Sequence, residues 1–162
     1  MTENIERRFH EFRADGDTVS GPLMVYGDEA RFGDWRERFQ PGSLTVGEDV
    51  IANLQHDRAR PVARTGAGLS LRDEGNALHA AIVFPNTAYA REARELVTAK
   101  ILRGFSIEFR SIREEWQQRT RIVHEARLLG LALVDRPAYP ASQIALRFEE
   151  MHVPPRTRRY WV

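Results

Sequence analysis

The stretch KILRGFSIEFR, residues Lys100–Arg110, organises the interpretation of this sequence. Every second residue from Phe105 to Phe109 is large and apolar, whereas Ser106 and Glu108 lie between them. This alternation predicts a β-strand, because successive strand side chains point to opposite faces. Gly104 before the strand allows another backbone or a ligand to approach closely. The sequence therefore predicts a packed strand that presents a serine and a glutamate on one face.

A serine held between two large apolar residues can serve as a nucleophile if a base lies beside it. The candidate base is His56, in the element LQHD. A third group usually orients the imidazole, and the candidates are Asp57, His124 and Glu125. On one strand His124 and Glu125 face opposite sides, so at most one of them can point to the site. Most serines and histidines have structural roles only, and the residues alone leave these alternatives open.

The composition predicts a single globular domain. The chain has 162 residues, of which 42% are hydrophobic and 29% charged. A chain of this length can bury a core without disulfide or metal cross-links. Its formal net charge of +1 gives no general attraction to nucleic acid or to acidic membranes. Arginine supplies nearly all the positive charge, because Lys100 is the only lysine.

Several classes of site are disfavoured by the sequence. The absence of cysteine excludes a disulfide framework, a thiol nucleophile and a thiolate metal site. No phosphate-binding glycine motif occurs, and the histidines lack metal-ligand spacing, so we expect neither cofactor nor metal. Apolar runs are too short for a membrane span, and the charged N-terminus does not resemble a secretory signal. A cytoplasmic origin is expected.

The first part of the chain contains several strand candidates and one clear helix. Val19–Tyr26 is strand-like, and Pro22 within it predicts an edge or a bulge. Leu69–Arg72 and Ala77–Phe84 flank a four-residue link that is typical of a hairpin. Asn86–Ala99 has apolar residues at helical spacing, with Asn86 or Thr87 as its cap.

The second part completes a β-rich α+β fold, which we expect to be a barrel or sandwich with peripheral helices. Arg121–Val134 is predicted to be a central strand because of its β-branched start and its internal glycine. Residues 141–148 are expected to form a short helix. The predicted organisation is an N-terminal arm (1–18), one domain (19–150) and a basic tail (151–162).

The order of six short motifs resembles that of the HK97-type prohead (capsid maturation) proteases of tailed phages and gene-transfer agents. That group is related to the herpesvirus assemblins. The resemblance extends from about Val19 to Leu146. The matching motifs are VSGPLMVYG (19–27), RFQPGSL (38–44), LQHD (54–57), LSLRDEGNALHAAI (69–82), GFSIEF (104–109) and LALVDRPAY (131–139).

The resemblance implies a serine endopeptidase on a compact β-barrel with surrounding helices, in which Ser106 is the nucleophile and His56 the base. The enzyme would act inside the assembling procapsid, in the cytoplasm of a bacterial host. Its substrates would be the scaffold and the major capsid protein. Homo-oligomerisation remains open, and neither a membrane nor nucleic acid is an expected partner.

The third member of the site departs from the family pattern. The family's acid aligns with Gly130, which has no side chain to orient an imidazole, and Glu108 stands where the family usually has glycine. Glu125 is therefore predicted as the substitute, with His124 and Asp57 as alternatives. Glu108 is expected to pair with Arg110 or Arg103, or to perturb the charge of the site.

Two further hypotheses follow from this departure and from the end of the chain. A histidine–serine dyad would work with water, or the protein would be a weak or inactive capsid-assembly module on the same fold. Arg136, after the late strand, is a candidate for polarising the oxyanion. The tail RTRRYWV (156–162) mixes arginine with aromatic residues, which suits a docking peptide or, as a distant alternative, a nucleic-acid contact.

Overall fold

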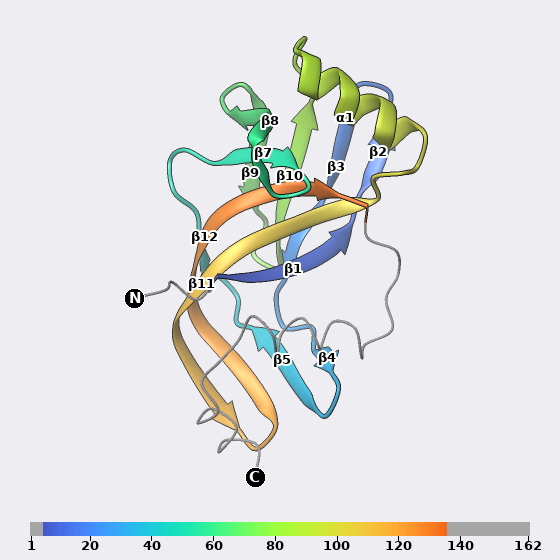
Figure 1. Ribbon diagram of the computed structural model, residues 1–162. Helices are drawn as coiled ribbons and strands as arrows, with labels where there is room; N and C mark the ends of the chain where they lie inside the picture. Colours follow the sequence, from blue (N-terminus) through green and yellow to red (C-terminus); the bar gives the residue numbers. More distant parts are fainter. Residues whose placement is uncertain (1–4, 136–162) are drawn as a thin grey trace.

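The computed structural model describes residues 5–135, which form twelve β-strands and one α-helix (Figure 1). The first six strands are β1 (Glu6–Glu11), β2 (Arg13–Asp15), β3 (Thr18–Val25), β4 (Ala30–Phe32), β5 (Trp35–Phe39) and β6 (Leu44–Thr45). The remaining elements are β7 (Ile51–Leu54), β8 (Asp57–Thr65), β9 (Gly68–Asp73), β10 (Ala77–Val83), α1 (Ala88–Thr98), β11 (Gly104–Gln117) and β12 (Thr120–Val134).

All twelve strands belong to one sheet that curls back on itself. Its main path runs β1-β11-β12-β7-β8-β9-β10-β3-β2, and the β4–β5 hairpin and β6 attach to β12. The two ends of this path, β1 and β2, are consecutive in the chain and are separated only by Phe12. The Phe12 N–H donates to the carbonyl of Arg103 at 3.2 Å. The sheet is therefore nearly closed and barrel-like, which confirms the predicted β-rich class.

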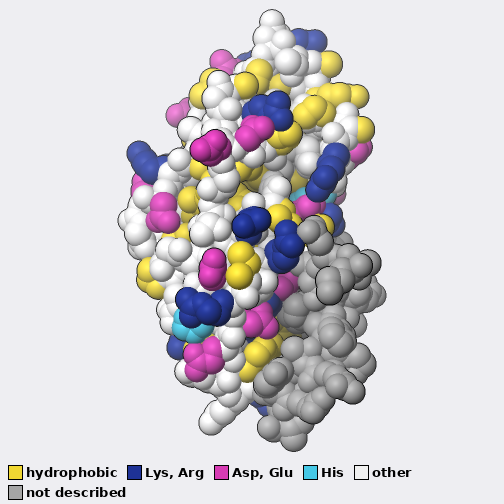
Figure 2. Space-filling view, turned by 90° about the vertical axis from the view of Figure 1, so that its left-hand side faces the viewer, with side chains coloured by type: hydrophobic (Ala, Val, Ile, Leu, Met, Phe, Trp, Pro, Cys, Tyr) yellow, Lys and Arg dark blue, Asp and Glu magenta, His cyan; other side chains and the backbone are white. Residues whose placement is uncertain are grey.

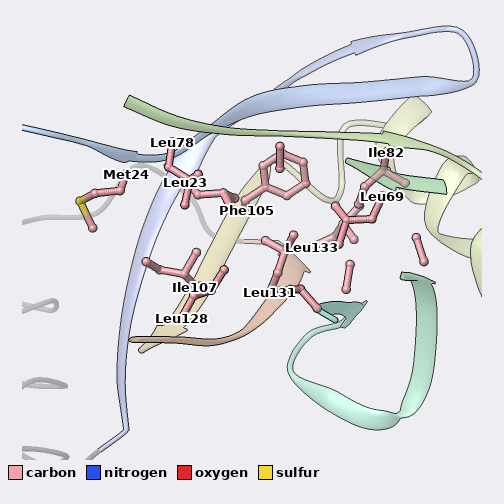
Figure 3. Close-up of a cluster of buried hydrophobic side chains, with 14 of the residues drawn as sticks. Leu23, Met24, Leu69, Leu78, Ile82, Phe105, Ile107, Leu128, Leu131 and Leu133 are labelled. Carbon is pink, nitrogen blue, oxygen red and sulfur yellow. The ribbon is translucent and has the colours of Figure 1, made fainter. Parts of the chain in front are cut away.

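The long hairpin of β11 and β12 crosses the molecule (Figure 1), with β1 beside β11 and with β5, β6 and β7 beside β12. As the alternation predicted, Phe105, Ile107 and Phe109 are each no more than 1% exposed. They pack with apolar side chains of β3, β9, β10 and β12 in one core (Figure 3). β12 is a strand with strands on both sides, so the prediction for Arg121–Val134 is confirmed.

The predicted hairpin and helix are also confirmed. β9 and β10 pair antiparallel around the turn, and β10 pairs with β3 through a register shift opposite Pro22, where a bulge was expected. The helix α1 begins after Thr87, whose hydroxyl accepts from the Ala90 N–H at 3.4 Å. Its buried residues, Ala90, Ala93 and Val97, form one apolar face of the helix.

The structure differs from the sequence prediction at the N-terminus. Part of the expected N-terminal arm forms the strands β1 and β2, and β1 pairs antiparallel with β11 along its length. This charged strand is anchored to β12, because Glu6 is buried and its Oε2 lies 2.6 Å from Arg121 Nη1. The expected helix over 141–148 and the tail over 151–162 lie outside the described residues.

The surface carries charges of both signs. On the face shown in Figure 2, basic and acidic side chains are interspersed, with small apolar areas between them. This mixture agrees with the formal net charge of +1. Within residues 5–135, no helix has the length and apolar character that would be needed to cross a membrane.

Candidate active site

Ser106 lies in the interior of the sheet, on a strand that is held from both sides. It pairs with Phe9 of β1 and with Ala132 of β12, and it is 2% exposed. Gly104 makes the close approach of β1 feasible. A Cβ there would lie 2.2 Å from a ring carbon of Phe9 and 2.4 Å from the carbonyl oxygen of His10. The strand geometry thus fixes the position of the serine hydroxyl.

His56 reaches the serine from the tight turn between β7 and β8. Gln55 and His56 occupy the two central positions, with φ of 53° and 61°. Positive φ at both positions is typical of a type I′ hairpin turn, which normally uses asparagine and glycine. A left-handed conformation costs other residues roughly 1–2 kcal/mol each. Such strain in two non-glycine residues points to a functional constraint on this turn.

Two hydrogen bonds hold this turn against the end of β12. The Gln55 N–H donates to the carbonyl of Leu133 at 3.0 Å, and the Asp135 N–H donates to Gln55 Oε1 at 3.3 Å. The imidazole then extends towards β11, where His56 Nε2 lies 2.8 Å from Ser106 Oγ. This is the distance at which a neutral imidazole accepts the serine proton. The structure therefore brings together the two residues that the sequence paired.

Glu108 is the acidic side chain that contacts His56. It lies two residues after Ser106 on the same strand face, and its Oε1 is 2.7 Å from His56 Nδ1. The side chains of His56 and Glu108 are only 7% and 11% exposed. With Nδ1–H donating to the carboxylate, Nε2 is left as an acceptor for the serine hydroxyl. Ser106, His56 and Glu108 form a continuous hydrogen-bonded chain with the geometry of a catalytic triad.

The charge of Glu108 is fixed by its partners. The hydrogen bond from His56 lowers the pKa of this carboxyl most, burial opposes it, and the positive charge of Arg7 adds to the lowering. The result is a pKa lowered from 4.5 to about 2. Its contribution to folding stability is accordingly present above pH 4.5 and is lost as the pH falls towards about 2. Near neutral pH the group is a carboxylate.

The prediction for Glu125 has to be corrected. Glu125 lies opposite Arg113 on the distant part of the β11–β12 hairpin. It precedes Ala132, the partner of Ser106, by seven residues, which corresponds to roughly 23 Å along a strand. The structure does not bring it to His56. Sequence spacing on β12 could not reveal this, because the register with β11 decides which residues meet.

The two alternatives to Glu125 have other partners. His124 Nε2 lies 3.0 Å from Glu115 Oε2. Asp57 Oδ1 accepts from the Ala59 N–H at 2.9 Å, a local turn contact next to the histidine. Glu108 likewise pairs with Arg7 at 2.9 Å and not with the expected Arg110 or Arg103.

Glu108 and Gly130 are direct cross-strand partners. The resemblance placed the acid at Gly130 and a glycine at Glu108, so the two residue types are exchanged between neighbouring strands. A Cβ at Gly130 would meet nothing within 4 Å, apart from its chain neighbours. The spacing Ser-x-Glu on one strand was the sequence signal for this arrangement, because it puts both side chains on one face.

Two other expectations concern the surroundings of the site. Arg136, the candidate for polarising the oxyanion, lies outside the described residues. Among residues 5–135, no group of three or more histidine, cysteine, aspartate or glutamate side chains is arranged to hold a metal ion.

Comparison with known proteins identifies one family. The family model described as caudovirus prohead serine protease matches residues 3–155, nearly the whole chain. Neither the curated proteins nor the solved structures contain a match to this chain. The family match confirms the resemblance to the prohead serine proteases of tailed phages.

Proposed function

The chain belongs to the caudovirus prohead serine protease family, and on that premise we propose that it is a serine endopeptidase that cleaves scaffold and major capsid protein. It acts inside the assembling procapsid of a tailed phage or gene-transfer agent, in the cytoplasm of the bacterial host. The observation that carries the proposal is the chain of contacts from Ser106 through His56 to Glu108.

The proposed mechanism follows from these contacts. His56 Nε2 takes the proton of Ser106 as Oγ attacks the scissile carbonyl, and the carbonyl π electrons move to its oxygen. Glu108 stabilises the imidazolium through Nδ1–H. The imidazolium then protonates the leaving amine, the C–N bond breaks, and Ser106 carries the acyl group. Water then attacks the acyl group with His56 again as base, and this second step releases the acid product and the free serine.

The contact between Glu108 and His56 bears on the alternative of an inactive protein. A non-catalytic assembly module was suggested because Gly130 cannot supply the orienting acid. Glu108 contacts His56 from the opposite strand, at the residue directly paired with Gly130. The missing side chain on β12 therefore no longer argues against catalysis, and the active enzyme is the hypothesis that the geometry favours.

Loss of the nucleophile is expected to abolish processing. The wild-type chain, Ser106→Ala and Ser70→Ala would each be co-expressed with the neighbouring scaffold and capsid proteins, and product masses measured by intact-mass spectrometry. Ser70 is a matched control because it is exposed on strand β9. We expect trimmed partners with wild type and Ser70→Ala, and uncut partners with Ser106→Ala. Identical uncut masses in all three samples, with particles still assembling, would support the assembly module instead.

A further inference from the structure

Strand β1 has two chemically different faces. Glu6 and Arg8 belong to a buried group of ionic side chains, whereas Arg7 and Phe9 are on the face that carries the site. The register places Arg7 opposite Glu108 and Phe9 opposite Ser106. An N-terminal segment that looks like a charged arm in sequence thus contributes two direct neighbours of the candidate triad.

Arg7 and His56 bind the same carboxylate oxygen. Arg7 Nη2 donates to Glu108 Oε1 at 2.9 Å, and His56 Nδ1 lies 2.7 Å from that oxygen. The terminal torsion of a glutamate has a broad, shallow preference, so one hydrogen bond alone orients its carboxylate loosely. Two donors that converge on one oxygen, one from β1 and one from the β7–β8 turn, restrict that rotation. A fixed cation also favours the ionised form of a poorly exposed carboxyl.

From these contacts we infer that Arg7 is a positioning residue, which holds the Glu108 carboxylate in the orientation that keeps His56 a base for Ser106. This inference rests on the proposed protease function. Arg7 contacts Glu108, and it acts on His56 and Ser106 through that carboxylate. Docking of β1 on β11 therefore completes the site.

The buried face of β1 sets the register that this role requires. Arg121 donates to Glu6 at 2.6 and 2.7 Å, and Arg8 Nε donates to Glu37 at 2.6 Å. A slip of one residue would turn every side chain of the strand to the other face. It would remove Arg7 from Glu108 and break both buried ion pairs together. The position of the arginine is thus specified by contacts outside the site.

The test compares Arg7→Met, Arg7→Lys and the control Arg119→Met. Arg119 also forms an arginine–carboxylate pair, at 3.0 Å with Asp34, but both side chains are more than half exposed. Two quantities would be measured in each full-length protein: the rate at which a fluorophosphonate labels Ser106, and the pH titration of the Glu108 carboxyl by carbon-13 NMR. Labelling reports activation of the serine, and the NMR titration reports the carboxylate directly.

We expect Arg7→Met to label about tenfold more slowly, as loss of one charge-assisted hydrogen bond predicts. In this variant the pKa of the Glu108 carboxyl should rise from about 2 towards 4.5. Arg7→Lys should recover most of both effects because the charge is kept, and Arg119→Met should change neither. Because the Arg7 side chain is 39% exposed, these substitutions leave the core intact.

Three results would overturn the inference. The first is labelling of Ser106 in Arg7→Met at the wild-type rate, even if the pKa of Glu108 changes, since the arginine would then have no effect on the serine. Another is an unchanged Glu108 titration in Arg7→Met. The third is equal slowing in Arg119→Met. If wild-type Ser106 labels no faster than background in Ser106→Ala, the proposed function fails instead, and the titration still decides whether Arg7 governs Glu108.

Discussion

Glu108→Gln is expected to lower the rate of partner cleavage by about 10⁴-fold, the loss seen when the orienting acid of a triad becomes an amide. A carboxylate accepts from His56 Nδ1–H, at 2.7 Å here, and so leaves Nε2 free to take the serine proton. A glutamine can donate its amide N–H to Nδ1 instead, which puts the imidazole proton on Nε2. The measurement is the initial rate of scaffold cleavage, with folding checked by thermal melting.

Glu125→Gln is the matched control for this prediction. The chemical change is identical, but Glu125 lies opposite Arg113, far along the hairpin from Ser106. Its cleavage rate should equal that of wild type. A large loss in Glu125→Gln together with normal cleavage in Glu108→Gln would reverse the assignment and restore the prediction made from the sequence.

A transplant of the acid tests the exchange between strands. Glu108→Gly should lose activity as Glu108→Gln does. Adding Gly130→Glu should make cleavage at least tenfold faster than in Glu108→Gly alone. Directly opposed residues have Cβ atoms about 5 Å apart, so a glutamate on β12 starts close to the same place. The absence of contacts within 4 Å around a Cβ at Gly130 leaves room for it. A folded double variant no faster than Glu108→Gly would argue against this equivalence.

The elements that sequence could predict are those whose pattern is local. β12, the β9–β10 hairpin and α1 have a periodicity or a turn signal that each segment carries by itself. β1 could not be recognised in this way, because a run with Glu6, Arg7 and Arg8 looks exposed. Its charges are compensated by Arg121 and Glu37, which are distant in sequence. Only the tertiary structure shows that such a segment pairs within the sheet.

The same distinction separates the predicted from the missed residues of the site. His56 and Ser106 were identified from short motifs in a recognisable order, and the structure places them in contact. The strand alternation places Glu108 on the face of the serine, but nothing local in the sequence pairs it with the histidine. The resemblance implies an acid on β12, and no local pattern shows which residue of β11 lies opposite Gly130. Cross-strand register is information that a single sequence does not contain.

Arg121→Met is expected to lower the free energy of unfolding by about 3–5 kcal/mol, the usual cost of removing one partner from a buried ionic group. Arg121 is fully buried and binds Glu6, Glu37 and Glu114, so its loss leaves carboxylates without their main counter-charge. Chemical denaturation measures the change. Arg119→Met, at an exposed pair, should cost less than about 1 kcal/mol.

A second substitution separates charge from packing as the cause of that loss. Adding Glu6→Gln to Arg121→Met removes one of the carboxylates left unpaired, so part of the stability should return. If the double variant is no more stable than Arg121→Met alone, the unpaired Glu6 carboxylate is not the main cause of the loss. Since Glu6 precedes Arg7 on β1, weakening this anchor should also release Arg7 from Glu108. Arg121→Met should therefore slow the labelling of Ser106 even at temperatures where the barrel remains folded.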